Sequence, residues 1–297
     1  MKHSTFCKKI NFNKLIILDC LSDGECQTAK HLYENLSDKG FREGVSYLKV
    51  PDVDAFRIII QEIKEFFNPE LDIGFQPIIH IEAHGSPLLM ELADKSTISW
   101  VELANDLREI NKLMKNKLII FIGTCHGYHF ILNNHTIKKF SPAYFCIAPL
   151  ELIPAHDVEI ASFTFYNSLL TTGNLTTSAN LLDSAKIYTY NSDFMFHKAF
   201  YETMQKNHRG KNLEKRKEYL LSTAIQLLGD KWNNMNPQEK DVYLKKSRSL
   251  LNDFLKDKES LKIQFNKFSI QFMGYANEDV FEEIWKHMQE NKQGNIY

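Results

Sequence analysis

Short apolar runs alternate with longer amphipathic stretches through the first two thirds of the chain. Apolar runs bounded by turn residues predict buried strands, and the stretches between them predict helices that cover a parallel sheet. The predicted strands are residues 15–18, 45–50, 78–81, 118–122, 144–148 and 187–190. The predicted helices are residues 26–36, 53–67, 100–114 and 157–170, and Ser99 with Glu102 predicts a capping box for the third.

The pattern changes at two places along the chain. Residues 88–92 and 96–98, separated by the short break Ala93-Asp94-Lys95, predict a small hairpin inserted before the third helix. From about residue 194 the strand signal weakens, and amphipathic stretches predict helices at 213–228, 237–255 and 280–288. Segments 261–265 and 268–272 fit either a hairpin or a helix.

These elements predict an α/β fold with a mostly parallel six-stranded sheet flanked by helices, followed by a mainly helical C-terminal extension. We place the first domain at residues 1–205 and a regulatory or docking region at 206–297. A chain of 297 residues with 43% apolar residues can bury a full core.

Composition narrows the classes of partner. The formal net charge of −1 offers no field that attracts nucleic acid, and acidic residues interrupt the basic runs of the tail. No apolar stretch is long enough to predict a membrane span. Five cysteines without metal-ligand or disulfide spacing, and an N-terminus without a signal-like apolar segment, predict a reduced, cytoplasmic protein with no metal and no cofactor.

Candidate chemistry stands at the carboxyl ends of two predicted strands. The third strand leads into His84-Gly85, and the fourth leads into Cys125-His126-Gly127. Because the carboxyl ends of parallel strands meet at one edge of a sheet, we expect an imidazole and a thiol there. Such a pair provides a nucleophile and its acid/base partner, and glycines let the two backbones approach closely.

This order of strand, His-Gly, hairpin, helix, strand and Cys-x-Gly resembles the clan CD cysteine peptidases, and is closest to their bacterial CHAT and metacaspase branch. The spacing of 41 residues from His84 to Cys125 is similar to the spacing of about 50 in caspases. The resemblance implies a caspase-like (caspase-hemoglobinase) fold and a Cys-His dyad. The nucleophile loop reads Gly-Thr-Cys-His-Gly instead of the caspase Gln-Ala-Cys-Arg-Gly, so cleavage after Asp does not carry over.

The resemblance also implies a mechanism and a pocket. The Cys125 thiolate would attack a peptide carbonyl of a protein substrate, the amides of Gly85 and Cys125 would hold the oxyanion, and a thioester would form. By position, Asp19, Asp23 and Glu151 would line a pocket for a Lys or Arg side chain. Related bacterial proteases are linked to antiviral defence or cell death, where an activating partner or ligand switches them on, and such a role is a hypothesis for this chain.

Two other functions remain open. The sequence Gly123-Thr-Cys-His-Gly127 also fits the nucleophile elbow of α/β-hydrolases and amidotransferases, whose partner histidine follows the nucleophile. His156 beside Asp157, or His197 near Asp193, would then be the base. A pseudo-peptidase scaffold that binds a partner through its tail is the non-enzymatic alternative.

Overall fold

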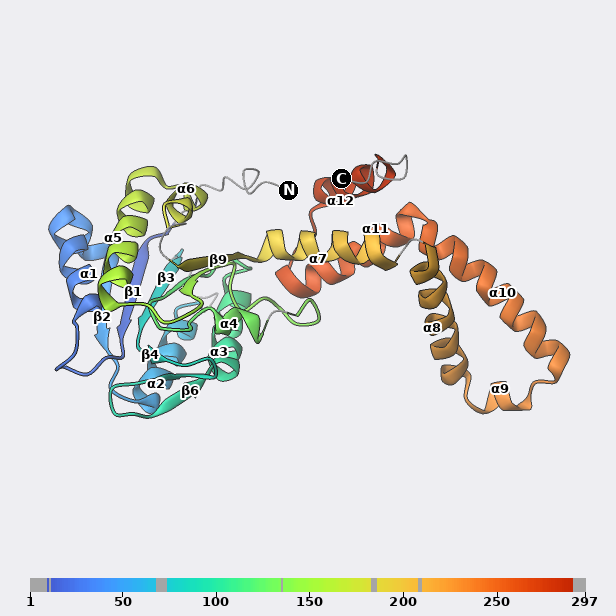
Figure 1. The fold of residues 1–297 in the computed structure, drawn as a ribbon, viewed down its shortest axis with the longest axis horizontal. Helices are drawn as coiled ribbons and strands as arrows, with labels where there is room; N and C mark the ends of the chain where they lie inside the picture. The colour runs from blue at the N-terminus through green and yellow to red at the C-terminus, as the bar shows by residue number, and fades with distance from the viewer. Residues whose placement is uncertain are drawn as a thin grey trace. The chain divides into compact units, whose positions relative to one another are not determined.

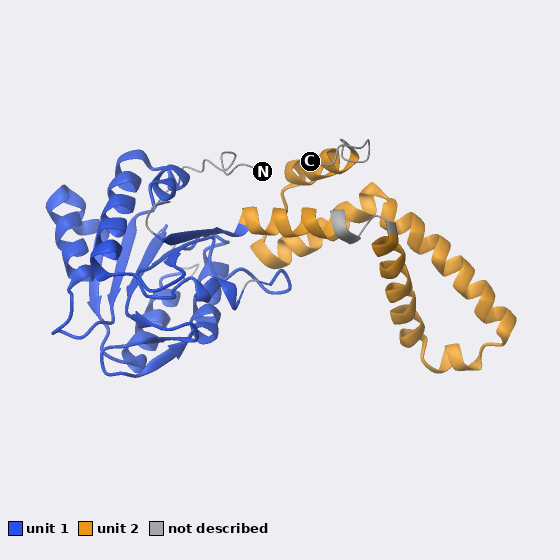
Figure 2. Cartoon of the chain, viewed as in Figure 1, with its two compact units in different colours: residues 1–192 blue, residues 193–297 orange. Residues whose placement is uncertain are grey.

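The computed structural model describes residues 10, 12–67, 74–134, 136–182, 186–207 and 210–290. Contacts divide the chain into two compact units, residues 1–192 and 193–297 (Figure 2). This division describes packing, so the functional boundary predicted at residue 205 stays a prediction. No helix among the described residues combines the length and the apolar character that crossing a membrane requires.

The first unit is built on a six-stranded sheet with the order β2-β1-β3-β7-β8-β9. Its strands are β1 (Lys14–Asp19), β2 (Val45–Lys49), β3 (Pro77–Glu82), β7 (Ile119–Ile122), β8 (Phe145–Pro149) and β9 (Ile187–Asn191). Neighbouring strands are parallel except β9, which runs antiparallel to β8. All six predicted strands are confirmed. The central strands are buried on both faces, which explains why they read as continuous apolar runs.

Helices cover both faces of this sheet (Figure 1). On one face lie α1 (Thr28–Leu36), α5 (Ala155–Thr172) and α6 (Leu175–Asn180), and on the other lie α2 (Val53–Glu65), α3 (Trp100–Leu113) and the short α4 (His129–Leu132). Short turns η2 (Ser37–Phe41) and η3 (Arg42–Gly44) connect α1 to β2. The predicted capping box of α3 is confirmed, because Ser99 and Glu102 exchange both hydrogen bonds.

A second, antiparallel sheet holds the histidine end of β3. It consists of β4 (His84–Gly85), β5 (Leu89–Glu91) and β6 (Thr97–Ser99). The predicted hairpin is confirmed, and it gains a third strand because His84 pairs with Glu91 and Gly85 with Met90. The backbone at His84 is therefore fixed by strand pairing instead of lying in an open loop.

The second unit is helical. Its helices are α7 (Ser192–Asn207), α8 (Gly210–Leu228), α9 (Asp230–Asn234), α10 (Pro237–Lys256), α11 (Lys258–Met273) and α12 (Glu278–Glu290). The hairpin alternative for residues 261–272 is wrong, since this segment belongs to α11. Its buried residues Leu261, Phe265 and Ser269 recur every four positions, and Asp257 caps the helix by accepting from the amide of Ser260.

Candidate active site

A cleft of about 440 Å³ opens beyond the carboxyl ends of β1, β3 and β7. The chain passes from β1 to β2 on one side, while β3 lies on the other side, so the strand order reverses between β1 and β3. Open parallel sheets bind ligands at such a switch point. Both His84 and Cys125 line the cleft, together with the loop after β1 and the start of α5. A smaller cavity of about 210 Å³, lined by Phe12, Pro77 and Tyr144, lies at the amino ends of the strands.

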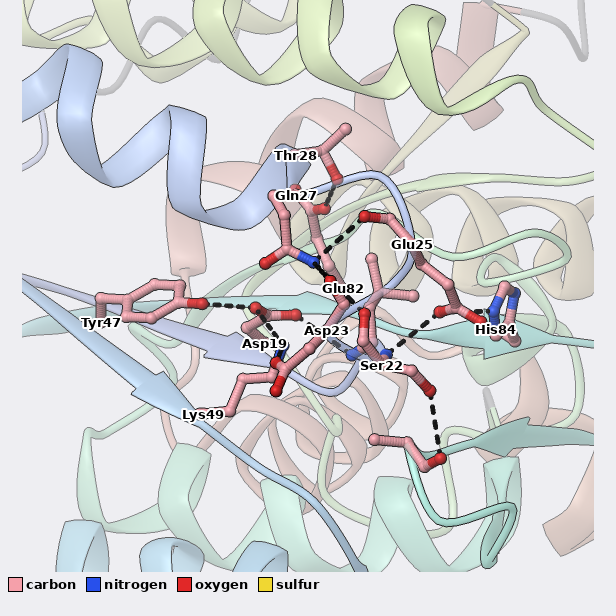
Figure 3. A network of polar contacts seen from close by, with 12 residues as sticks. Asp19, Ser22, Asp23, Glu25, Gln27, Thr28, Tyr47, Lys49, Glu82 and His84 are labelled. Carbon is pink, nitrogen blue, oxygen red and sulfur yellow. Dashed lines mark hydrogen bonds and ion pairs between the residues drawn. The ribbon is translucent and has the colours of Figure 1, made fainter.

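His84 is held by a carboxylate from the loop after β1. Its Nε2 lies 3.0 Å from Oε2 of Glu25, and its side chain is 51% exposed (Figure 3). The same carboxylate oxygen accepts from the amide of Ser22. The hydrogen bond with His84 lowers the pKa of Glu25 below its ordinary value, so the carboxylate stays charged beside the ring.

Cys125 lies in a compact turn after β7. The amide of Gly127 donates to the carbonyl of Thr124 at 2.9 Å, and His126 has a φ of +59°. A left-handed backbone costs about 1 kcal/mol at a residue other than glycine, and such strain gathers at functional sites. The thiol lies between the backbone groups of Ile153, whose amide is 3.5 Å and carbonyl 3.6 Å from Sγ.

The two strand-end loops touch at Gly85. A Cβ at this position would lie 2.3 Å from the carbonyl oxygen of Cys125 and 2.4 Å from Cγ2 of Thr124. Only glycine fits so close a contact without displacing one of the loops. The close approach predicted for Gly85 is confirmed, and the contact joins the histidine loop to the cysteine loop.

No hydrogen bond between His84 and Cys125 is present among the described residues; both side chains instead face the same cleft. A substrate carbonyl would have to sit between them. Catalytic pairs are often apart without substrate and come together only around it. The amide of Cys125 also donates to no backbone carbonyl or side chain within the part of the chain that the structure describes, so it is available to an oxyanion.

The acidic residues predicted for the substrate pocket take other partners. Asp19 is buried and accepts from Leu21, Tyr47 and Lys49, and the Lys49 ammonium also lies 3.1 Å from Asp23 (Figure 3). One lysine therefore offsets charge on both aspartates. Neither aspartate is among the described residues that line the cleft.

Glu151 also stands apart from the cleft lining. Its side chain is exposed, and its backbone carbonyl accepts from the amide of His126 at 3.2 Å. Asp19, Asp23 and Glu151 are therefore all absent from the described lining of this cleft. Their role in substrate binding stays a prediction.

A buried polar chain underlies the cleft. The carboxylate of Glu82 accepts from the hydroxyl of Thr28 and contacts Nε2 of His80 at 2.8 Å. The other ring nitrogen of His80 lies 3.2 Å from the hydroxyl of Tyr166, and all four side chains are buried. Each polar group finds a partner, so the network can stay in the core without a large desolvation penalty. Glu82 also lines the cleft and gives its floor a carboxylate.

Sequence reasoning missed three titratable side chains among the described lining residues of this cleft, which are Glu25, Cys26 and Glu82. Glu25 and Cys26 follow the turn at residues 22–24, which is closed by the hydrogen bond from the Glu25 amide to the Ser22 carbonyl. The carboxyl ends of parallel strands converge at one edge of the sheet, and this holds for β1 as well as for β3 and β7. Considering the residues at and after the ends of all three strands would have predicted Glu25, Cys26 and Glu82 as part of the site.

Neither a metal site nor a similar known protein indicates what the cleft does. Within the described ranges, no three His, Cys, Asp or Glu side chains are grouped so that they would hold a metal ion. No protein-family model matches the chain, and no curated protein gives a significant match.

Proposed function

We propose that the cleft is the active site of a cysteine endopeptidase of the caspase-like type, with Cys125 as nucleophile and His84 as acid and base. The contact between Gly85 and the carbonyl of Cys125 carries the proposal, because it joins the loops of two chemically complementary residues at one cleft. The mostly parallel six-stranded sheet agrees with the resemblance that the sequence offers.

In this mechanism the Cys125 thiolate attacks the carbonyl carbon of a peptide bond. The carbonyl electron pair moves to oxygen, and the amides of Gly85 and Cys125 stabilise the oxyanion. When the tetrahedral adduct collapses, the C–N bond breaks and His84 gives its proton to the leaving amine. Water then attacks the thioester with His84 as base, which releases the acid product and restores the thiol.

Glu25 determines which nitrogen of His84 takes up and releases the proton. A carboxylate only accepts hydrogen bonds, so the Nε2 atom that faces Glu25 at 3.0 Å carries the hydrogen. In the neutral ring Nδ1 is then the basic nitrogen. Glu25 is a positioning residue, because it fixes the tautomer and orientation of His84 and stabilises the charged imidazolium that forms during the reaction.

The partly exposed carboxylate of Glu25 favours a cationic substrate side chain. Glu25 lines the cleft, where it also pairs with His84, and His84 is the one basic side chain among the described lining residues. A Lys or Arg side chain would be attracted by this carboxylate. Glu82 also lines the cleft, but it is buried and bound to Thr28 and His80, so it adds little to this attraction.

The hydrolase alternative depends on a histidine that follows Cys125. The His156 side chain is 76% exposed, and its Nδ1 lies 4.0 Å from Glu159. Although its neighbour Ala155 lines the cleft, His156 is not among the described lining residues. The geometry therefore favours His84 over His156.

Active-site labelling tests the proposal. Full-length protein is treated with acyloxymethyl ketone probes that carry Lys, Arg, Asp or Leu at P1, and the adduct is located by peptide mass spectrometry. We expect a Cys125 adduct that forms fastest with Lys or Arg, is absent in Cys125→Ala and is strongly slowed in His84→Ala. His156→Ala is the matched control and should label at the wild-type rate.

Two outcomes would contradict the proposal. Labelling that requires His156 and tolerates His84→Ala would support the hydrolase alternative. An adduct on Cys26 that persists in Cys125→Ala would mean that the wrong thiol has been assigned as nucleophile. Equal rates for all P1 groups would contradict only the preference for a cationic side chain.

A further inference from the structure

The described cysteines fall into two groups. Cys20 and Cys146 are fully buried, and burial raises the pKa of each thiol well above its ordinary value. Buried thiols in such surroundings are inert. By contrast, Cys26 is exposed and Cys125 is partly exposed. Reagents in solution can therefore reach Cys26 and Cys125.

These two accessible thiols line the same cleft. Cys26 follows Glu25, whose carboxylate lies 3.0 Å from the ring of His84. Gly85, the next residue after His84, is packed against the backbone of Cys125. This series of contacts places Cys26 in the wall of the cleft that Cys125 also lines.

A thiol that reacts with oxidants and has a second thiol close by follows a known course. Oxidation first gives a sulfenic acid, which a neighbouring thiol converts into a disulfide. Without that second thiol, further oxidant converts the sulfenic acid into sulfinic and sulfonic acids, which are not reversed by simple thiols. Whether an accessible cysteine has such a neighbour therefore decides whether its oxidation can be undone.

We propose that Cys26 and Cys125 form a reversible disulfide across the cleft when the protein meets a hydroperoxide. The Cys125 thiolate attacks the peroxide, the O–O bond breaks, and Cys125 becomes a sulfenic acid while hydroxide or an alkoxide leaves. The Cys26 sulfur then attacks the sulfenic sulfur, the S–O bond breaks, and water leaves as the S–S bond forms. The two thiols lose two electrons and the peroxide is reduced.

The bridge has two consequences. It removes the nucleophile and spans the cleft, so that neither substrate nor probe can enter. It also protects Cys125 from irreversible oxidation, because reduction of the disulfide restores both thiols. The loss of activity rests on the proposed function, whereas formation of the bridge depends only on the two thiols.

The bridge sets a geometric requirement. The Cα atoms of bridged cysteines lie roughly 4.4–6.8 Å apart. Residues 20–27 between β1 and α1 contain no helix or strand, and Cys26 lies within this segment. Peptide mapping reports directly whether the two sulfur atoms meet.

The experiment uses the full chain and hydrogen peroxide. After treatment, free thiols are alkylated and the protein is digested without reductant for mass spectrometry. We expect a peptide that links Cys26 to Cys125 and lacks two hydrogen atoms relative to its separate parts. Cys20 and Cys146 serve as internal controls, and they should be alkylated only after unfolding.

Recovery distinguishes a protective bridge from a chance one. In wild-type protein, dithiothreitol should restore most of the free Cys125 thiol. In Cys26→Ser, the same peroxide dose should leave Cys125 as sulfinic or sulfonic acid, and the recovered fraction should fall several-fold. Cys26 is exposed, so this variant should fold, and circular dichroism checks that it does.

Three results would overturn the inference. The first is oxidation of Cys125 without formation of the peptide that links it to Cys26. The second is recovery of the free Cys125 thiol in Cys26→Ser to the same extent as in wild type. The third is a disulfide that joins two separate chains. Since mapping does not measure peptidase activity, a bridge in a protein that no peptide probe labels would support this inference and contradict the proposed function. Normal probe labelling without a bridge would do the reverse.

Discussion

Oε2 of Glu25 lies 3.0 Å from Nε2 of His84, although the two residues are far apart in the sequence. Their contact assigns different tasks to the two ring nitrogens of His84, since the one that faces the carboxylate carries a hydrogen. The loop after β1 is therefore part of the candidate site, alongside the loops after β3 and β7.

Replacing Glu25 tests this relationship. Glu25→Gln should slow alkylation of Cys125 by a peptide ketone about 10- to 100-fold, because the tautomer and orientation of His84 are no longer fixed. Glu34→Gln is the matched control, since its side chain lies in α1, is 55% exposed and pairs with Lys30. Glu25→Asp should restore part of the rate. If the Glu25 and Glu34 variants react alike, the contact has no positioning role.

Adding one methyl group at Gly85 tests the contact between the two loops. Gly85→Ala should lower the free energy of unfolding by about 1–3 kcal/mol, because its Cβ would overlap the Cys125 carbonyl. Gly24→Ala is the matched control, since a Cβ there has no neighbour within 4 Å and should change stability by less than about 0.5 kcal/mol. Urea denaturation measures both. Equal stability of the two variants would show that the loops do not touch in solution.

Replacing Thr124 with valine should raise the stability of the protein, in contrast to the substitution at Gly85. Among the described residues, its buried Oγ1 is one of the side-chain atoms without a hydrogen-bond partner. Thr124→Val keeps the shape and removes that hydroxyl, so stability should rise by about 1 kcal/mol. Thr124→Ser keeps the hydroxyl and removes the methyl group that packs against Gly85, so stability should fall. A Val variant less stable than wild type would mean that the hydroxyl is hydrogen-bonded in solution.

The helical unit should lose stability in mild acid. Burial lowers the pKa of His197 from 6.5 to about 4, against the opposing effect of Asp193. Between these two pH values the unfolded chain binds a proton that the folded chain does not, so stability falls as pH drops and levels off below about 4. The full loss is about 3 kcal/mol.

Denaturation midpoints of the helical signal between pH 7 and 4 measure this effect. His197→Gln should flatten the decline. His156→Gln, which replaces an exposed histidine of the other unit, controls for the loss of a histidine and should keep the decline. A wild-type slope in the His197 variant would assign the acid sensitivity to another group.

The strands were predictable because burial on both faces leaves a continuous apolar run in the sequence. The positions of His84 and Cys125 at one cleft were predictable for a related reason, since parallel strands end at the same edge. The segment 261–272 was ambiguous because short alternating runs also satisfy a helix. This segment forms a helix because its buried side chains pack in the core of the second unit. The local sequence pattern does not contain that information.

The partners of Asp19 and Asp23 were harder to predict because they depend on strand register. Asp19 pairs with Lys49 across β1 and β2, and this neighbour lies 30 residues further along the chain. Nothing local to Asp19 indicates that a lysine will take its charge. The contact between Glu25 and His84 depends in the same way on how two distant loops meet.

The packing of Gly85 against Cys125 also limits how the site can be switched. A Cβ at Gly85 would lie 2.3 Å from the carbonyl oxygen of Cys125, so a shift of the cysteine loop requires the histidine loop to move as well. Under the proposed function, a signal that separated Cys125 from His84 would first have to break this contact. Regulation would then act more easily on the walls of the cleft, above all on the segment from Leu21 to Gln27, which contains the Glu25 carboxylate that contacts His84.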